Sequence, residues 1–363
     1  HFNISSYYRR HKLFNELTDY AMQSYFGGKI ESYVLGYIDK AQVIDITSAY
    51  PYSLAQLPAL TKKVIKSSDI TKLKDYYYAF INCTITITDE KLIHPVNIRS
   101  PFNDTNISPV GTFHATITKV EYDYLLMHNA KIIVHDYIAV VHTNHYPYKK
   151  MIHHLFNERL KTRTTNRSLS NLYKLILNSL YGITYELTDS FDDVGEWIGY
   201  RAGDFFNPII ASYITALTRT YLSRVSNNII ENGGQVLLNM TDSIIYQGHV
   251  TLDVFSHKKV LGKFENPTPI KDVIILGAGR YEYLNDFTKE YTIKTRGFSA
   301  KLKDQSFYSL LDLSKSTTIS SKSFVTFFKA TTLKYSHQML GHIIDEDYEI
   351  NPLNIGGKRI IDN

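Results

Sequence analysis

Cysteine is almost missing from this chain of 363 residues, because Cys83 is its one example. A lone thiol forms no intramolecular disulfide and no thiolate metal site, so any metal must be held by oxygen or imidazole ligands. This usage fits a reducing compartment or a protein that is indifferent to redox conditions. The sequence also lacks the apolar run of roughly 18 to 20 residues that a membrane helix needs, and it shows no signal peptide. We therefore expect a soluble protein.

The chain starts at His1 instead of a methionine. We expect a processed protein or a piece of a longer one, from which an upstream domain could be missing. Its length is sufficient for a large core and for two or three subdomains. No internal repeat and no low-complexity linker divides it.

The formal net charge of +5 does not by itself indicate a nucleic-acid partner. Its distribution says more, because residues 149–167 hold six basic side chains and one acid, Glu158, and 6 − 1 = +5 equals the excess of the whole chain. A solvated helix face and a phosphate-binding surface both explain such a cluster. The six are Lys149, Lys150, Arg159, Lys161, Arg163 and Arg167.

The hydrophobic pattern predicts an α+β fold. Alternating apolar residues favour strands in the first half, and a period near 3.6 favours helices in the middle. Gly182 is expected to end the first long helix. We expect strands at 42–47, 80–88 and 131–141, helices at 149–181 and 208–228, a hairpin around Asp242, and further strands up to about 295.

Within the first predicted helix, Lys174, Asn178 and Tyr181 stand at i, i+4 and i+7 and therefore project from one face. The opposite face is apolar and comprises Leu172, Leu175, Ile176 and Leu180. Continued backwards, the polar spacing reaches Arg167 and Arg163. A turn at residues 164–166 would instead place both arginines at its tip. An ordinary amphipathic surface helix remains the plainer interpretation of this pattern alone.

Asp242 lies in the stretch NMTDSIIY, residues 239–246, at the expected tip of the hairpin. A single aspartate in a turn usually serves only to stabilise that turn. Whether it does more depends on partners from distant segments. Asp45 is such a partner, because an acid among Val43, Ile44 and Ile46 is costly in a strand unless it is exposed or paired with a cation.

Three short motifs resemble those of B-family DNA polymerases. The stretch KLILNSLYG, residues 174–182, resembles the fingers motif K-x-x-x-N-S-x-Y-G, and DITSAYP, residues 45–51, resembles the first palm motif D-x-x-S-x-Y-P. MTDS, residues 240–243, resembles the second palm motif, which usually reads D-T-D-S. The three occur in the family's order, with separations of 178 − 45 = 133 and 242 − 178 = 64 residues.

Two further stretches resemble the protein-primed branch of that family, known from phages, adenoviruses and linear plasmids. YFGG, residues 25–28, resembles its Tyr/Gly-Gly element, and IKTRGFSAKLK, residues 293–303, resembles the element that leads into its small thumb. The exonuclease domain that such enzymes carry upstream has no counterpart in this sequence.

The resemblance implies a right-hand polymerase with an antiparallel palm sheet, helical fingers and a small thumb. It implies a palm from residues 1–60 and 208–266, a terminal-protein-binding insertion at 61–146, fingers at 147–183, a second insertion at 184–207, and a thumb and tail at 267–363.

The same resemblance assigns the chemistry. Two Mg²⁺ ions would be held by Asp45, Asp242 and the backbone carbonyl of Ile46, and phosphoryl transfer physically requires such a carboxylate pair. Tyr50 would pack beneath the deoxyribose and exclude a 2′-hydroxyl. The expected dNTP-binding residues are Ser48, Tyr50, Arg163, Arg167, Lys174, Asn178 and Tyr181. The expected DNA-binding residues are Tyr25, Gly27, Gly28, Thr241, Arg280, Tyr281 and Lys294.

Two positions depart from the family pattern. Met240 stands where the second palm motif usually has its first Asp, and Gly279 stands where a primer-gripping K-x-Y element has its Lys, with Arg280 as the nearest substitute. We therefore keep a second interpretation, a catalytically degenerate polymerase remnant that serves as a structural or DNA-binding subunit of a larger assembly. A third is a single-strand binding protein without catalysis.

The expected activity is template-directed DNA synthesis from dNTPs, with primer-template DNA and a terminal protein as partners. The richness in Ile, Asn, Tyr and Lys favours a linear plasmid of mitochondria over a virus or phage in its host cell. The location itself is left unknown.

Overall fold

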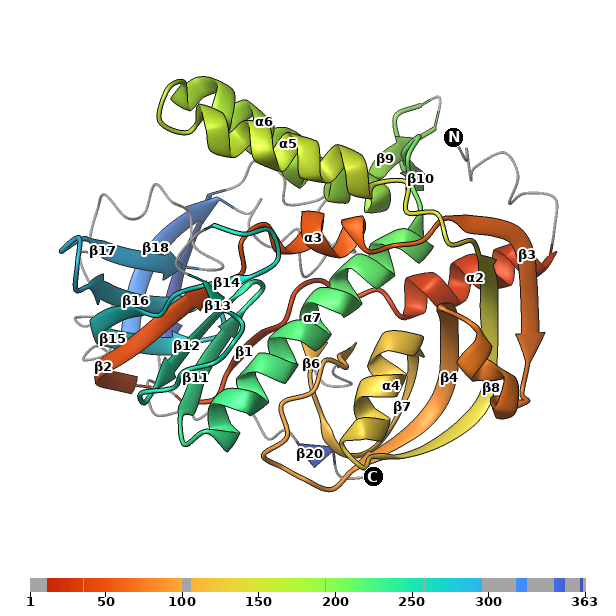
Figure 1. Cartoon of the computed structure of the whole chain (residues 1–363), viewed down its shortest axis with the longest axis horizontal. Helices are drawn as coiled ribbons and strands as arrows, with labels where there is room; N and C mark the ends of the chain where they lie inside the picture. The colour runs from red at the N-terminus through yellow and green to blue at the C-terminus, as the bar shows by residue number, and fades with distance from the viewer. Residues whose placement is uncertain are drawn as a thin grey trace.

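The computed structural model describes residues 12–34, 36–99, 106–192, 194–256 and 259–295, together with the backbone of three short strands nearer the C-terminus. Two β-sheets lie on either side of a long central helix, and a pair of helices lies above them (Figure 1). The fold is thus of the α+β class that the hydrophobic pattern predicts. No helix in these described ranges is both long and apolar enough to cross a membrane.

The first sheet, here the large sheet, has seven strands. Every neighbouring pair in it is antiparallel. Its centre pairs a strand from the start of the chain, β2, with the expected hairpin of β11 and β12, which comes almost 200 residues later. In spatial order the strands are β1 (Ile30–Ser32), β11 (Gln235–Met240), β12 (Ser243–Gln247), β2 (Gly36–Asp45), β15 (Thr268–Gly277), β16 (Arg280–Asn285) and β17 (Tyr291–Thr295).

The two faces of the large sheet carry different apolar clusters, because neighbouring strand residues point to opposite sides. On one face Ile44 and Ile244 pack with Leu222 and Val225 of α7 (Pro208–Glu231). The other face carries a second apolar cluster, which Val43 joins. Helix α7 starts where the sequence predicts: the Asn207 side chain accepts a hydrogen bond from the Ile210 amide, and a proline takes the first helical position.

The second sheet, here the small sheet, has five strands. It contains the predicted strands β4 (Tyr78–Ile87) and β8 (Lys131–His142), with the order β20-β7-β4-β8-β3. Helix α4 (Lys119–Met127) starts with a capping box between Thr118 and Glu121. The remaining strands of this sheet are β3 (Leu60–Ser67), β7 (Val110–Thr118) and β20 (Ile360–Ile361).

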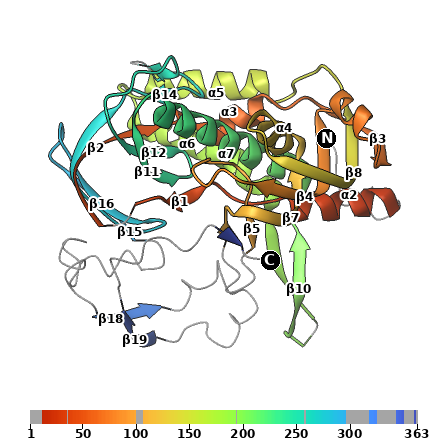
Figure 2. The same cartoon turned by 90° about the horizontal axis from the view of Figure 1, so that it is seen from below.

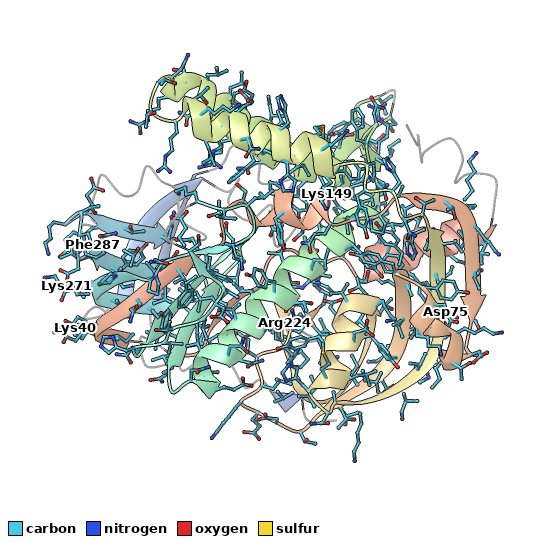
Figure 3. All side chains as sticks on the ribbon, in the orientation of Figure 1. Lys40, Asp75, Lys149, Arg224, Lys271 and Phe287 are labelled. Carbon is cyan, nitrogen blue, oxygen red and sulfur yellow. The ribbon has the colours of Figure 1, made fainter. Side chains whose placement is uncertain are left out.

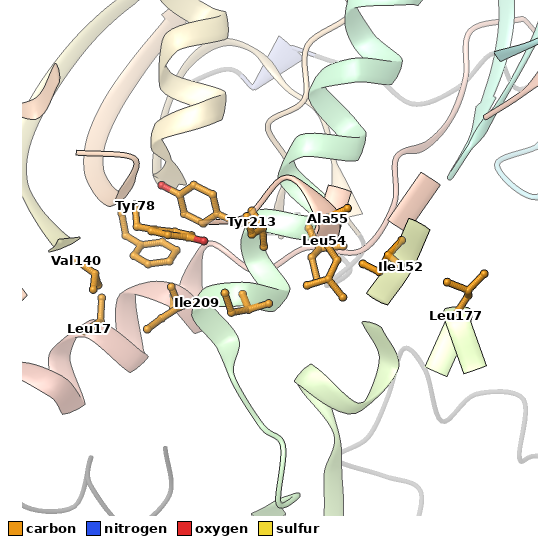
Figure 4. Packing of buried hydrophobic residues seen from close by; sticks show 14 of the residues in the cluster. Leu17, Leu54, Ala55, Tyr78, Val140, Ile152, Leu177, Ile209 and Tyr213 are labelled. Carbon is orange, nitrogen blue, oxygen red and sulfur yellow. The ribbon is translucent and has the colours of Figure 1, made fainter. Parts of the chain in front are cut away.

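A core of apolar side chains joins the helices to the small sheet (Figure 4). Tyr213 of α7 lies beside Tyr78 of β4, with ring centroids 4.7 Å apart. Leu17 comes from α2 (Lys12–Gln23), and Leu54 comes from α3 (Ala49–Ala55), the short helix that directly follows β2. The whole region between the two sheets is therefore packed.

The region predicted as one helix from 149 to 181 is two helices. These are α5 (Lys149–Thr162) and α6 (Arg167–Gly182), and they form an antiparallel hairpin. The alternative of a turn at residues 164–166 is correct, because Asn166 caps the second helix by accepting a hydrogen bond from the Leu169 amide. Gly182 ends α6 as predicted. Three residues of its apolar face remain exposed to solvent: Leu172, Leu175 and Ile176.

Shorter elements complete the described structure. The hairpin of β9 (Leu187–Phe191) and β10 (Trp197–Ala202) projects from the body of the molecule (Figure 2). The others are η1 (Ile70–Asp75), η2 (Ile183–Tyr185), β5 (Ile98–Arg99), β6 (Asn106–Ile107), β13 (Phe255–Ser256), β14 (Phe264–Glu265), β18 (Thr318–Phe324) and β19 (Ile343–Glu349). The thumb-like element expected at 293–303 lies outside the described residues from 296 onward, as does most of the expected thumb.

Candidate functional site

Asp45 and Asp242 meet at the end of the central strand pair, although 242 − 45 = 197 residues separate them in sequence. Asp45 is the last residue of β2, and its antiparallel partner is Ser243, the residue that follows Asp242. The amide of Ile46 donates a 2.7 Å hydrogen bond to the carbonyl oxygen of Asp242. Strand pairing therefore fixes the spacing of the two acids.

Negative charge accumulates where these acids meet. The pKa of Asp45 is raised from 3.8 to about 6, first because the surrounding protein excludes water from the carboxyl group, and then by the charges of Asp242 and Glu265. The pKa of Asp242 is also raised, mainly by the same loss of hydration. Both side chains nevertheless remain exposed to solvent. An accessible pair of acids of this kind favours a bound cation.

The ligand chemistry of the pair fits Mg²⁺. This ion prefers oxygen ligands and is usually held by one or two carboxylates, with water and substrate phosphates in the remaining positions. Within the described ranges no group of three or more His, Cys, Asp or Glu side chains could hold a metal ion. Asp45 and Asp242 would therefore need oxygen ligands from the main chain, solvent or substrate, which Mg²⁺ accepts.

Lysines surround the two acids. The charges of Lys259 and Lys294 lower the pKa of Asp45 against the upward shift, and those of Lys174 and Lys294 do the same for the pKa of Asp242. Lys174 belongs to α6, so the helical hairpin brings one predicted residue to this site. Asn178, one turn further along α6, is exposed.

Three tyrosines connect the acids to α6 and to the expected Tyr/Gly-Gly element. The ring of Tyr50, on α3, stacks on that of Tyr181, with centroids 4.4 Å apart and an angle of 23° between the planes. The hydroxyl groups of Tyr181 and Tyr25 share a hydrogen bond of 2.9 Å. Tyr25 also stacks on Tyr185, with centroids 3.5 Å apart. These predicted residues therefore come together from three segments of the chain.

Gly28 lies directly against the turn that carries Asp242. A β-carbon there would be 2.6 Å from Cγ2 of Thr241 and 2.7 Å from the hydroxyl oxygen of Tyr50, whereas a β-carbon at Gly27 would meet nothing within 4 Å. Thr241 has a left-handed backbone with φ of 58°, and its amide donates a 2.7 Å hydrogen bond to the Lys29 carbonyl. Thr241 is thus a turn residue that joins the two motifs.

Arg219 of α7 holds the same loop from the other side, which the sequence did not reveal. Its side chain is fully buried and donates hydrogen bonds to the carbonyl oxygens of Phe26, of Gly27 at 2.8 Å and of Pro95 at 2.9 Å. It also forms an ion pair of 2.6 Å with Glu121 of α4. The one available signal is a cation in an otherwise uncharged helical stretch, where an arginine is costly unless it has partners.

The arginines nearest the first acid differ from those expected. Arg159 of α5 donates a 3.2 Å hydrogen bond to the hydroxyl oxygen of Ser48, three residues after Asp45. The expected Arg163 and Arg167 are exposed at the tip of the α5–α6 hairpin. Sequence spacing alone could not show that Arg159 faces α3, because this depends on how the hairpin packs on the rest of the chain.

Glu265 is a second unforeseen neighbour of Asp45. An isolated bridge between Ile46 and Phe264 brings it there, and it forms an ion pair of 2.6 Å with Lys259. The hydroxyl of Thr47 donates a 3.4 Å hydrogen bond to the same carboxylate. No local sequence signal marks this glutamate.

The two departures from the family pattern have a structural context. Met240 packs into the apolar cluster of the large sheet that contains Val43 and Ile245. Gly279, with φ of 79°, forms the turn between β15 and β16. Arg280 and Tyr281 follow on β16. Both departures therefore contribute to the packing or the turns of the sheet.

Comparison with known proteins agrees with these motifs. A family model described as DNA polymerase type B, organellar and viral, matches residues 6–184. A DNA polymerase of Acidianus bottle-shaped virus (isolate Italy/Pozzuoli) is 30% identical over 290 residues, which cover 76% of this chain and 40% of that relative. The chain thus spans well under two thirds of the relative's length.

Solved structures of Phi29 DNA polymerase share the fold. The orthorhombic crystal form superposes with a TM-score of 0.67 at 17% identity, over 93% of this chain and 63% of that one. A post-translocation complex with primer-template DNA gives 0.68 at 15% identity, over 94% and 63%. Together with the motifs around Asp45, Lys174 and Asp242, these likenesses show that the chain belongs to the organellar and viral type B DNA polymerases.

Proposed function

We propose that this chain is the polymerising part of a template-directed DNA polymerase, which adds dNTPs to a primer 3′-hydroxyl. The meeting of Asp45 and Asp242 at neighbouring strand ends carries the proposal. Of the similar structures, one is of Phi29 DNA polymerase with primer-template DNA and incoming nucleotides. That title supports DNA and nucleotides as the ligands of this chain.

The elements suggest a division of labour. In our proposal the large sheet and α7 form the palm, the α5–α6 hairpin forms the fingers, and the small sheet forms an insertion that receives a priming protein. The β9–β10 hairpin would be the second insertion. The Tyr/Gly-Gly loop at 25–28 contacts elements of palm, fingers and insertion, which suits a role in guiding the template strand.

Asp45 and Asp242 would bind the reactive phosphates through Mg²⁺. When bound, such ions polarise phosphoryl oxygens and lower the pKa of a coordinated hydroxyl. The chain's own contribution is to hold both carboxylates at a fixed spacing through the β2–β12 pairing. The carbonyl of Ile46 belongs to the same segment and is our candidate for a further ligand.

Residues of α6 and α3 would receive the incoming nucleotide. Lys174 lies where its charge acts on Asp242, so it is suited to neutralise a triphosphate held at the acids. Tyr50, stacked on Tyr181, would form a flat wall beneath the sugar and the base. Arg159, through its contact with Ser48, is a better candidate for phosphate binding than Arg163.

Primer extension tests this function. The full chain with a primer-template, dNTPs and Mg²⁺ should lengthen the primer, and Asp242→Asn should reduce the rate about 10³-fold or more, since several kcal/mol of transition-state stabilisation are lost. Asp39→Asn is the matched control, because Asp39 is an exposed acid on the same strand as Asp45. Equal rates for the two variants would exclude the proposed site.

A non-catalytic scaffold is the second candidate, and Met240 is the observation that favours it. At this position an acid of the second palm motif is replaced by a side chain that packs in an apolar cluster. The scaffold predicts that the unmutated chain binds primer-template without extending it. Extension that depends on Asp242 would exclude it.

A further inference from the structure

Strand register puts Lys294 on the face of the large sheet that carries the first acid. Lys294 of β17 is the direct antiparallel partner of Tyr281 of β16, and residues paired in this way share a face. Tyr281 packs in the same apolar cluster as Val43, and Val43 lies two residues before Asp45 on β2. Residues at i and i+2 of a strand point to the same side. Lys294 therefore lies on the face of Asp45.

The ammonium group of Lys294 is available for an anion. Its side chain is exposed, and no other residue of the described ranges forms a hydrogen bond or an ion pair with it. Lys259, the other lysine that acts on Asp45, is already paired with Glu265. Lys294 also lowers the pKa of both Asp45 and Asp242, so its charge reaches the space above the pair.

Arg280, the neighbour expected to grip the primer, points elsewhere. It precedes Tyr281 on β16, so its side chain lies on the opposite face of the sheet. There its guanidinium atoms lie 3.5 to 4.0 Å from a β-carbon built on Gly277, and burial lowers its pKa. A lysine at Gly279 would cost about 1 kcal/mol, because that residue has a left-handed backbone.

We propose that Lys294 binds a backbone phosphate of the primer strand beside Asp45 and Asp242. This rests on the proposed function, since it presumes that the large sheet receives a primer-template. Lys174 approaches the acids from α6, and Lys294 approaches from the far end of the sheet at β17, so the two lysines suit different phosphates. A cation supplied by the strand opposite Tyr281 makes good the lysine that the turn at Gly279 excludes.

The salt dependence of DNA binding tests the proposal without requiring catalysis. Binding of the full chain to a labelled primer-template with a recessed 3′ end is measured by fluorescence anisotropy from about 50 to about 200 mM salt, without dNTPs. Loss of one phosphate contact lowers the slope of log K against log salt by about 0.7 to 0.9. Lys294→Ala should show this loss and Lys294→Arg should retain the slope, which a merely structural role would not produce.

Lys40→Ala is the control, because it removes one exposed positive charge from the same sheet. Lys40 lies on β2 five residues before Asp45, about 16 Å along the strand, and pairs with Lys271 at the outer edge of the molecule (Figure 3). Its slope should equal that of the unmutated chain. Comparable slopes for Lys294→Ala and Lys40→Ala would overturn the proposal.

Two further outcomes separate the alternatives. A slope lowered by Arg280→Ala instead of Lys294→Ala would assign the contact to Arg280. An unchanged slope together with a raised KM for dNTPs in Lys294→Ala would assign this lysine to the incoming triphosphate. Failure of the unmutated chain to bind primer-template would overturn the proposed function and this inference together, whereas binding without extension would leave only the catalytic claim refuted.

Discussion

Gly28 and Thr241 lie so close together that the glycine has no room for a β-carbon, which would come within 2.6 Å of the threonine Cγ2 and 2.9 Å of its Cα. Gly28→Ala is therefore expected to lower the free energy of unfolding by about 1 to 3 kcal/mol, in the range of overpacked sites. It should also slow nucleotide addition, because Thr241 precedes Asp242. Chemical denaturation and primer extension measure the two effects.

Gly27→Ala provides the comparison for that experiment. Its β-carbon would meet nothing within 4 Å, and the carbonyl that Arg219 contacts is retained. The variant should unfold and extend primers like the unmutated chain. Equal losses in both variants would mean that loop flexibility, and not the contact with Thr241, is responsible.

The buried ion pair of Arg219 and Glu121 should be sensitive to the loss of one partner. Glu121→Gln leaves a guanidinium without a counter-charge in a dry environment, and breaking such pairs typically costs about 3 to 5 kcal/mol. Lys119→Gln removes one partner of an exposed pair on the same helix and should cost less than about 1 kcal/mol. Urea unfolding of both variants gives the comparison. Equal midpoints would contradict the importance of burial.

The raised pKa of Asp45 predicts opposite pH trends with and without Mg²⁺. Because the folded carboxyl has a pKa of about 6 against 3.8 ordinarily, the folded state binds its proton more tightly, and this contribution to stability is lost as pH rises through that window. Mg²⁺ requires the ionised carboxylates, so its stabilising effect should grow as pH passes about 6. Thermal unfolding with and without Mg²⁺ at about pH 5 and about pH 8 checks the sign. In Asp45→Asn the growth with pH should largely disappear.

Tyr50 should govern the choice between deoxyribonucleotides and ribonucleotides. Tyr50→Val removes the ring that stacks on Tyr181 and opens space where a 2′-hydroxyl would otherwise clash. We expect relative ribonucleotide use, measured as a ratio of kcat/KM values, to rise at least about tenfold. Tyr50→Phe keeps the ring and should keep the discrimination. A ratio unchanged in Tyr50→Val would remove this residue from the sugar-binding role.

Local patterns predicted the parts of this structure that short-range forces determine. The strand ending at Asp45, the turn at Asp242 and the end of α6 at Gly182 follow from alternation, turn chemistry and helix termination. The family motifs added the expectation that distant segments meet. Where only periodicity was available, the break between α5 and α6 remained one of two alternatives.

Contacts that depend on the packing of distant segments were not predictable. Arg219 contacts carbonyl oxygens of two segments more than a hundred residues away, and no spacing rule links it to them. The apolar face of α6 shows the complementary difficulty. Periodicity reports that Leu172 and Leu175 share a helix face, but it does not report whether any element covers that face.

The guanidinium of Arg219 contacts the Tyr/Gly-Gly loop, the Pro95 carbonyl and α4 at once, and the last two belong to the segment between α3 and α5. Excising that segment as a cassette would strand a cation in the interior and release the loop beside the acids. Ancestors or relatives with a shorter segment here would need a different residue on α7. The insertion and the strand-guiding loop are therefore constrained to diverge together.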